Sequence, residues 1–157
     1  MRIGIGHDTH RLVPGGPLRC GGLSIPFDRH LEGHSDADVL LHAITDAILG
    51  AAAQGDIGEL FPNTAEENRQ RDSAEMLAIA ARQVVEAGYR VENLDCIVFA
   101  QEPKLGPYKA QMAAQIATIL GISSSQVSVK AKTGEHVGPV GRGEAMQAEA
   151  IVLLDVA

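Results

Sequence analysis

Strand-like and helical segments alternate along this chain of 157 residues, and this alternation limits the fold more than any other feature. Short apolar runs predict strands, whereas apolar residues three and four apart predict helices. The predicted strands cover about residues 2–6, 93–101, 127–133 and 144–155, and the predicted helices about 35–53, 74–87 and 107–120. This order favours an α+β fold, in which helices pack on one face of a mixed β-sheet.

A glycine pair predicts an additional β-hairpin near the N-terminus. Gly21 and Gly22 separate two short apolar runs, residues 17–20 and 23–27. Glycine tolerates the positive φ angles that a two-residue hairpin turn requires. No predicted helix remains to cover the second face of the main sheet, so we expect oligomerisation to cover it.

The first predicted helix begins with a capping-box pattern. Ser35 stands at the expected N-cap position and Asp38 follows three residues later. Each side chain could accept a hydrogen bond from an unpaired backbone N–H, and Asp36 would add negative charge at the positive end of the helix dipole. This structural role explains the two aspartates, and direct metal ligation is the alternative.

The composition predicts one domain over residues 1–157 in a cytoplasmic protein. The net charge is −7, with no basic stripe or patch, so neither nucleic acid nor a membrane is an expected partner. Cys20 and Cys96 form no CxxC motif, which is typical of reduced thiols. No apolar run approaches the roughly 20 residues of a membrane span, and the first residues, MRIGIGHDTH, do not resemble a targeting peptide.

Two histidines and one carboxylate predict a zinc site. Asp8 and His10 are two residues apart, so in an extended chain their side chains point to the same side. With His42 from the first helix they would supply three ligands and leave a fourth position open, as in catalytic zinc sites. Asp46, one turn beyond His42, could orient its ring. The alternatives are a hydrogen-bonded core histidine and two ordinary loop residues.

The glycine-rich segments do not match known nucleotide-binding fingerprints. The GIG at residues 4–6 lacks the third glycine of a dinucleotide motif, and TGEHVGPVGRGE lacks the GKS or GKT that ends a P-loop. Lys132 and Arg142 could still contact phosphate near this loop. The free N–H groups at the start of the first predicted helix could bind an anion next to the metal. The residues therefore predict a metal site beside a phosphate site, without defining a substrate.

Three segments are distinctive: DTH at residues 8–10, HSDADVLLHAITDAILGAAAQGDIGELFP at 34–62, and GRGEA at 141–145. They resemble the motifs of the 2-C-methyl-D-erythritol 2,4-cyclodiphosphate synthase family. The resemblance extends over essentially the whole chain, and the long central block is highly specific. It implies an enzyme of non-mevalonate isoprenoid biosynthesis that converts 4-diphosphocytidyl-2-C-methyl-D-erythritol 2-phosphate into a cyclic diphosphate and CMP. The 2-phosphate would attack the β-phosphorus of the same molecule, which is the reaction of a phosphorus–oxygen lyase.

The resemblance also implies roles for individual residues. Asp8, His10 and His42 would bind zinc, and Glu135 would help to hold Mg²⁺ or Mn²⁺ between the α- and β-phosphates. His34 would align a phosphate, and Thr133 would polarise the α-phosphate. Beyond these residues, the implied substrate contacts are Thr9, Ser35, Asp56, Ile57, Gly58, Phe61, Asn63, Ala100, Pro103, Lys104, Leu105, Gly106, Lys132, Gly134 and Arg142.

The family resemblance implies a homotrimer with active sites between subunits, but three positions depart from the family pattern. Asn63 replaces a usual aspartate, and Gly134 replaces a commonly polar residue. Pro139 replaces a phenylalanine that lines an axial cavity able to hold a prenyl diphosphate, so this ligand is doubtful here. The alternatives to a synthase are a zinc-dependent phosphohydrolase and a non-catalytic protein that binds a metal or a prenyl phosphate.

Overall fold

The computed structural model describes residues 1–157 and contains a five-stranded mixed sheet in the order β4-β1-β7-β5-β6. Its strands are β1 (Arg2–Pro14), β4 (Arg29–Leu31), β5 (Tyr89–Phe99), β6 (Val127–Lys132) and β7 (Ala145–Val156). The central strand β7 runs antiparallel to both β1 and β5, whereas β5 and β6 are parallel. The predicted α+β class with a mixed sheet is confirmed.

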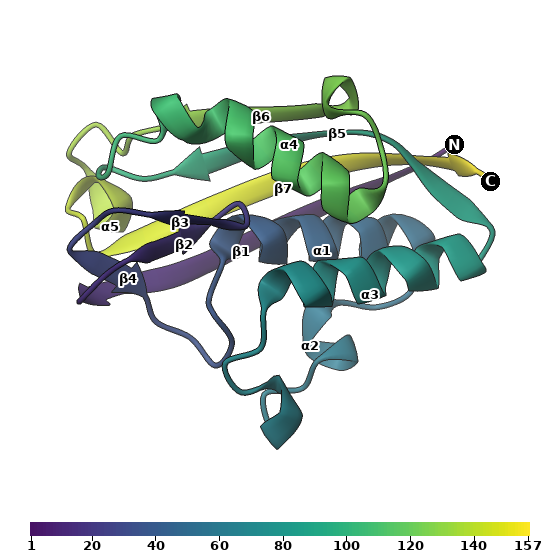
Figure 1. Ribbon diagram of the computed structural model, residues 1–157, viewed down its shortest axis with the longest axis horizontal. Coiled ribbons are helices and arrows are strands. Elements are labelled where there is room, and N and C mark those ends of the chain that lie inside the picture. The colour runs from purple at the N-terminus through teal and green to yellow at the C-terminus, as the bar shows by residue number, and fades with distance from the viewer.

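The three long helices pack on one face of this sheet, as Figure 1 shows. They are α1 (Val39–Ala52), α3 (Ser73–Glu86) and α4 (Lys109–Leu120). On the other face, Ile3, Ile5 and Ile151 remain 72%, 71% and 48% exposed. The prediction of helices on one face and an uncovered second face is therefore confirmed.

Helix α1 lies directly on the backbone of β1 because glycines occupy the points of contact. A Cβ atom added to Gly4 would lie 2.0 Å from the carbonyl oxygen of Ala47, and one added to Gly6 would lie 1.9 Å from that of Ala43. No real Cβ tolerates such distances, so only glycine permits this approach. The close packing brings the α1 side chains next to the middle of β1.

The predicted hairpin is present as β2 (Leu18–Cys20) and β3 (Leu23–Ile25), which form a separate two-stranded sheet. Gly21 and Gly22 form the turn with φ angles of +62° and +76°. Both residues therefore adopt the left-handed conformation that the glycine pair predicted.

Strand β1 continues to Pro14 instead of ending at Gly6. It pairs with β7 from Arg2 to Arg11 and then with the unpredicted strand β4 at Leu12. These ladders supply backbone hydrogen bonds to a polar segment that local sequence reasoning assigned to a loop. Strand β5 likewise begins at Tyr89, before the predicted residue 93.

The predicted N-cap of α1 is wrong. The helix begins at Val39, and Asp38 is its N-cap, with a side chain that accepts from the Leu41 N–H at 3.1 Å. Ser35 instead accepts from the N–H of Ala37, which has a φ angle of +58°, so the chain turns before the helix can start. The Ser35 pattern was misleading because this turn uses the same side-chain-to-backbone bonds as a cap.

The ends of the other helices agree better with prediction. Helix α3 ends one residue before Ala87, with Gly88 at the predicted left-handed position, φ +89°. Helix α4 ends at the predicted Leu120, with Gly121 as its C-cap, but it begins at Lys109, after a 3₁₀ turn over Gly106–Tyr108. No helix is long and apolar enough to span a membrane.

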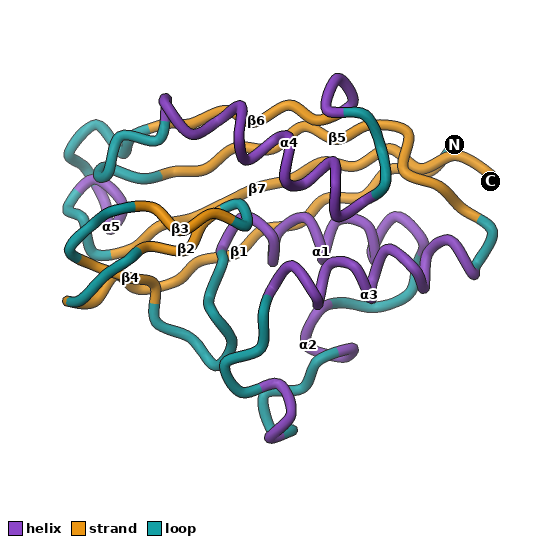
Figure 2. Tube along the Cα trace, in the orientation of Figure 1, coloured by secondary structure: helices purple, strands orange, loops and turns teal.

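The segment from α1 to α3 projects from the rest of the molecule (Figure 2). It contains the short helix α2 (Ile57–Leu60) and a 3₁₀ turn over Glu66–Asn68. The predicted glycine-rich loop near the C-terminus likewise contains a short helix, α5 (Gly138–Gly141). Sequence periodicity could not identify these elements because they have only three or four residues each.

Candidate active site

Asp8 and His10 on β1 meet His42 on α1, and the ligand atoms of all three lie within 4.8 Å of one another. The Asp8 Oδ2 atom is 2.8 Å from His10 Nε2 and 3.1 Å from His42 Nδ1. The two β1 side chains point to one side because they are two residues apart on a strand. The predicted cluster is therefore present, and its carboxylate and two imidazoles suit a zinc ion.

The ring of His10 is oriented by the backbone of the chain. Its Nδ1 atom is 2.8 Å from the carbonyl oxygen of Glu32, which can only accept a hydrogen bond. Nδ1 therefore carries the proton in the neutral ring, and Nε2 presents a lone pair toward Asp8 and His42. This tautomer is the one that a metal ligand needs.

The ring of His42 contacts two serines instead of the expected Asp46. Its Nε2 atom is 2.8 Å from Ser73 Oγ and 3.1 Å from Ser35 Oγ. The Asp46 carboxylate accepts from the backbone N–H of Ile57 at 2.7 Å and so fixes the start of α2. The expected role of Asp46 is corrected: the side chain one turn beyond His42 bonds to the neighbouring segment.

The cluster attracts positive charge. Burial raises the pKa of Asp8, but hydrogen bonds and charges from His10 and His42 outweigh it and lower the pKa to about 2. Burial lowers the pKa of His10, but the hydrogen bond and charge of Asp8 outweigh it and raise the pKa above its ordinary value. Asp8 is therefore ionised at neutral pH and favours a proton or a metal ion beside it.

A cavity of about 260 Å³ opens beside the cluster. Its lining brings together the predicted zinc ligands and many of the predicted substrate residues, namely Asp8, His10, His34, Ser35, His42, Ile57, Gly58, Phe61 and Asn63. Asp56 lies next to this cavity as the N-cap of α2, where its side chain accepts from Glu59 N–H at 2.9 Å. Sequence reasoning missed Asn68 and Met76, which also line the cavity.

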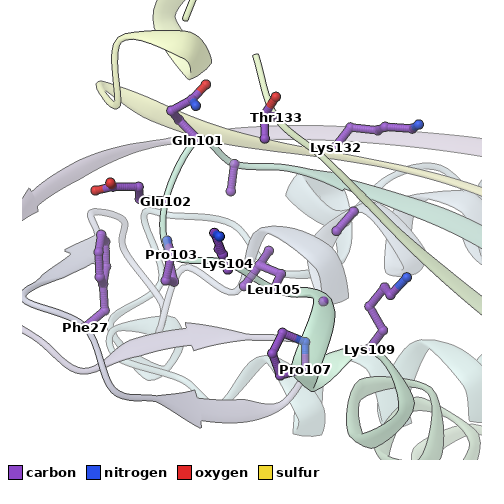
Figure 3. Close-up of a pocket in the computed structure, with 13 residues that line it drawn as sticks. Phe27, Gln101, Glu102, Pro103, Lys104, Leu105, Pro107, Lys109, Lys132 and Thr133 are labelled. Atoms are coloured by element: carbon purple, nitrogen blue, oxygen red, sulfur yellow. The ribbon is translucent and has the colours of Figure 1, made fainter. Parts of the chain in front are cut away.

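A second cavity, of about 720 Å³, lies at the carboxyl ends of the parallel strands β5 and β6. This is the edge at which α/β proteins commonly bind ligands. Its lining includes the predicted residues Ala100, Pro103, Lys104, Leu105, Gly106, Lys132 and Thr133. Figure 3 shows the 103–107 segment between Phe27 and Lys109. Phe27 was not predicted, because it reaches this cavity from a segment distant in sequence.

The remaining predicted residues lie outside both cavities. The Thr9 side chain lies 3.2 Å from His7 Nε2, on an exposed part of β1. Arg142 donates from Nε to Glu144 at 2.8 Å. Glu135 is exposed, and its N–H donates to Thr133 Oγ1 at 3.1 Å. A Cβ added to Gly134 would lie 2.3 Å from the Gly141 nitrogen, which explains the glycine there.

Comparisons with known proteins agree with this geometry. The YgbB family matches residues 1–155. The chain is 55% identical to the 2-C-methyl-D-erythritol 2,4-cyclodiphosphate synthase of Rhodopirellula baltica, over 98% of this chain and 93% of that protein. The structure of a 2C-methyl-D-erythritol-2,4-cyclodiphosphate synthase bound to CDP matches with a TM-score of 0.90 and 36% identity, over 98% of this chain and 100% of that one.

A bifunctional relative also matches. The bifunctional IspDF from Campylobacter jejuni superimposes with a TM-score of 0.96 and 41% identity, over 99% of this chain but 42% of that chain. The similarity therefore extends over nearly all of the present chain and over one part of the longer protein.

Proposed function

This chain belongs to the YgbB family, and from that membership and its two cavities we propose how it works as a 2-C-methyl-D-erythritol 2,4-cyclodiphosphate synthase. In the reaction, an oxygen of the substrate's 2-phosphate forms a bond to the β-phosphorus. The bond from this phosphorus to the bridging oxygen breaks, and CMP leaves with that oxygen. No water is consumed, so the enzyme is a phosphorus–oxygen lyase. The proposal rests on one observation: the cluster of Asp8, His10 and His42 lies beside a cavity lined by residues that the family resemblance implies as substrate contacts.

The cluster fits Zn²⁺ because it offers two imidazoles and one ionised carboxylate. Asp8, His10 and His42 would hold this ion. When bound, zinc supplies Lewis acidity, which draws electrons from a phosphate oxygen. The exposed Glu135 would contribute a carboxylate oxygen to Mg²⁺ or Mn²⁺ arriving with the diphosphate, since such ions bind through few carboxylates plus substrate phosphates.

The smaller cavity would hold the methylerythritol phosphate end of the substrate. His34 and Ser35 stand on its wall and can donate hydrogen bonds to phosphate oxygens. Asp56, Gly58 and Asn63 would contact the polyol from the segment around α2. The work of these residues is alignment, since an intramolecular attack needs mainly a fixed geometry and neutralised charge.

The larger cavity would hold the cytidine diphosphate end. The 100–106 segment would bind the base, largely through backbone groups, and Phe27 adds an apolar wall. Lys132 and Thr133, which line this cavity, would contact the α-phosphate and stabilise the charge that develops as CMP leaves.

The two cavities share no lining residue, which supports the proposal of active sites between subunits. In a homotrimer the larger cavity of one subunit would face the Asp8, His10 and His42 cluster of the neighbouring subunit. Ile3, Ile5 and Ile151 would then lose their exposure in the subunit contacts. Residues 1–157 would act as one domain in the cytoplasm.

Phosphorus NMR tests the proposal. The chain is mixed with 4-diphosphocytidyl-2-C-methyl-D-erythritol 2-phosphate, Zn²⁺ and Mg²⁺, with and without a chelator. We expect CMP and a cyclic diphosphate that appear only without the chelator. Inorganic phosphate as the product would identify a phosphohydrolase instead. A folded, zinc-loaded trimer without turnover would indicate a non-catalytic binding protein.

A further inference from the structure

A buried serine links the cluster of Asp8, His10 and His42 to a carboxylate on the opposite side of the serine. Ser73, the first residue of α3, has no exposed surface, and its Oγ atom lies 2.8 Å from His42 Nε2. The same hydroxyl donates to Asp36 Oδ1, and the Ser73 backbone N–H donates to Asp36 Oδ2 at 3.1 Å. Asp36 therefore holds the serine through both its hydroxyl and its backbone.

The protons that His42, Ser73 and Asp36 can carry determine which group donates and which accepts in this hydrogen-bond network. Nδ1 of His42 faces Asp8 and His10, so it must present a lone pair when the cluster binds a metal. Nε2 then carries the proton and donates to Ser73. A hydroxyl has one proton, and Ser73 gives its own to Asp36, so its lone pair is available to His42. The network therefore favours the tautomer that a metal ligand requires.

Ser35 is the competing acceptor, but its surroundings differ. Its Oγ is farther from Nε2, at 3.1 Å, and accepts from the Ala37 N–H at 3.2 Å. Unlike Ser73, it lines the cavity and has no hydrogen bond to a carboxylate. If Ser73 accepts the proton of His42, the Ser35 hydroxyl is left to bind a phosphate oxygen.

We propose that Asp36 and Ser73 form a positioning pair that fixes the ring orientation and tautomer of His42 as a metal ligand. The proposal rests on the proposed function only in taking the cluster of Asp8, His10 and His42 as a metal site. It gives Asp36 a role that neither helix capping nor direct ligation describes, because its carboxylate acts through Ser73.

The test measures Zn²⁺ binding to the full chain without substrate, by competition with a chromophoric chelator. We expect Ser73→Ala to weaken binding about 10- to 100-fold, the usual effect of losing a partner of a metal-bound histidine. Asp36→Asn should weaken it in the same direction, and the double variant should lose less than the two separate losses combined. The absorption bands of bound Co²⁺ should also change, because the ligand ring is free to rotate.

Asp72→Ala is the matched control. Asp72 caps the same helix start, accepting from the Ala74 N–H at 2.9 Å, but has no contact with His42. Its loss should leave Zn²⁺ binding within about twofold, since caps affect mainly helix stability. Ser35→Ala should also bind Zn²⁺ nearly as well as the parent chain.

The outcomes are distinct. Unchanged Zn²⁺ affinity in folded Ser73→Ala and Asp36→Asn would overturn the pairing, as would an equal loss in Asp72→Ala. A loss confined to Ser35→Ala would make Ser35 the acceptor. If Ser73→Ala does not fold, Asp36→Asn decides, because it keeps the serine and the side-chain size. A chain that binds Zn²⁺ with the expected ranking but forms no cyclic product would contradict the proposed function and leave the pairing intact.

Discussion

The Asp8 carboxylate lies 2.8 Å from Nε2 of His10, the same atom that must present a lone pair to a metal. Because Asp8 raises the pKa of His10 above its ordinary value, a proton competes with the metal for this position. We expect Zn²⁺ affinity to fall by up to about tenfold per unit as the pH decreases through that raised pKa. Chelator competition between about pH 8 and pH 6 measures this, and a flat profile would contradict it.

The stability of the metal-free chain should show the opposite trend with pH. The His10 pKa is raised on folding, so protonated His10 beside Asp8 stabilises the fold below the ordinary histidine pKa. This contribution is lost as the pH rises through the raised value. The effect should be on the order of 1 kcal/mol or less, because both side chains are partly exposed. Urea unfolding of parent and His10→Gln chains with a chelator, at several pH values, isolates it.

The close approach of α1 and β1 predicts that Gly6→Ala strongly destabilises the fold. Its Cβ would meet the Ala43 carbonyl oxygen, so helix and strand must separate. Overpacking of this kind costs about 1–3 kcal/mol, and the same movement would draw His42 away from Asp8 and weaken Zn²⁺ binding. Urea unfolding and chelator competition measure the two effects.

Gly50→Ala provides the control in the same helix. Gly50 lies in α1, is exposed, and has nothing within 4 Å of an added Cβ. Alanine there should stabilise the chain by about 0.5–1 kcal/mol, because it restricts the unfolded state and favours the helix. If Gly6→Ala and Gly50→Ala had similar stabilities, the close contact would not be limiting.

Local periodicity suggested the cluster of Asp8, His10 and His42 but left ordinary core and loop roles open, and the family resemblance implied the zinc assignment. Asp8 and His10 share one side of any extended segment, and His42 lies within an apolar run that must be helical and near the core. The contacts around this cluster were not predictable in the same way. Ser73 meets His42 from 31 residues away, and only the packing of α3 on α1 brings them together.

At the start of α1 the prediction failed for a different reason. The local capping pattern at Ser35 was present, but Ser35 forms a turn before the helix instead of its cap. Asp38 accepts from Leu41 as a cap, yet it also accepts from the backbone N–H groups of Gly21 and Gly22 at 2.9 and 2.8 Å. One carboxylate thus anchors both the helix and the hairpin turn. Ser35 carries the better local cap pattern, but no local rule includes the distant hairpin that selects Asp38.

Asp38→Ala should therefore cost more than the loss of a helix cap. Asp38 is fully buried, and the substitution leaves three backbone N–H groups without their hydrogen-bond acceptor. Each such group costs about 1–3 kcal/mol, so we expect a loss of at least about 3 kcal/mol. Asp72→Ala, which removes an exposed cap, should cost about 1 kcal/mol. Equal losses in urea unfolding would show that the hairpin contacts add nothing.

We expect Arg29 to affect the affinity for a nucleotide but not the affinity for Zn²⁺. Its guanidinium lies 4.9 Å from the centre of the Phe27 ring, and Nη1 donates to the Gly143 carbonyl oxygen at 2.7 Å. It thereby holds Phe27, which lines the larger cavity, against the loop that precedes β7. Lysine keeps the charge but cannot provide the planar stacking and the directed hydrogen bond together.

We accordingly expect Arg29→Lys to weaken CDP binding about threefold to tenfold, the loss of roughly 1 kcal/mol of stacking and hydrogen bonding. Calorimetric titration with CDP measures this effect. Zn²⁺ affinity should stay unchanged, because no residue of the metal cluster lines the larger cavity. Phe27→Leu should weaken CDP binding in the same direction, and adding Arg29→Lys to it should cost little more, since the arginine acts through the ring. Fully additive losses would mean that Arg29 contacts the nucleotide by another route.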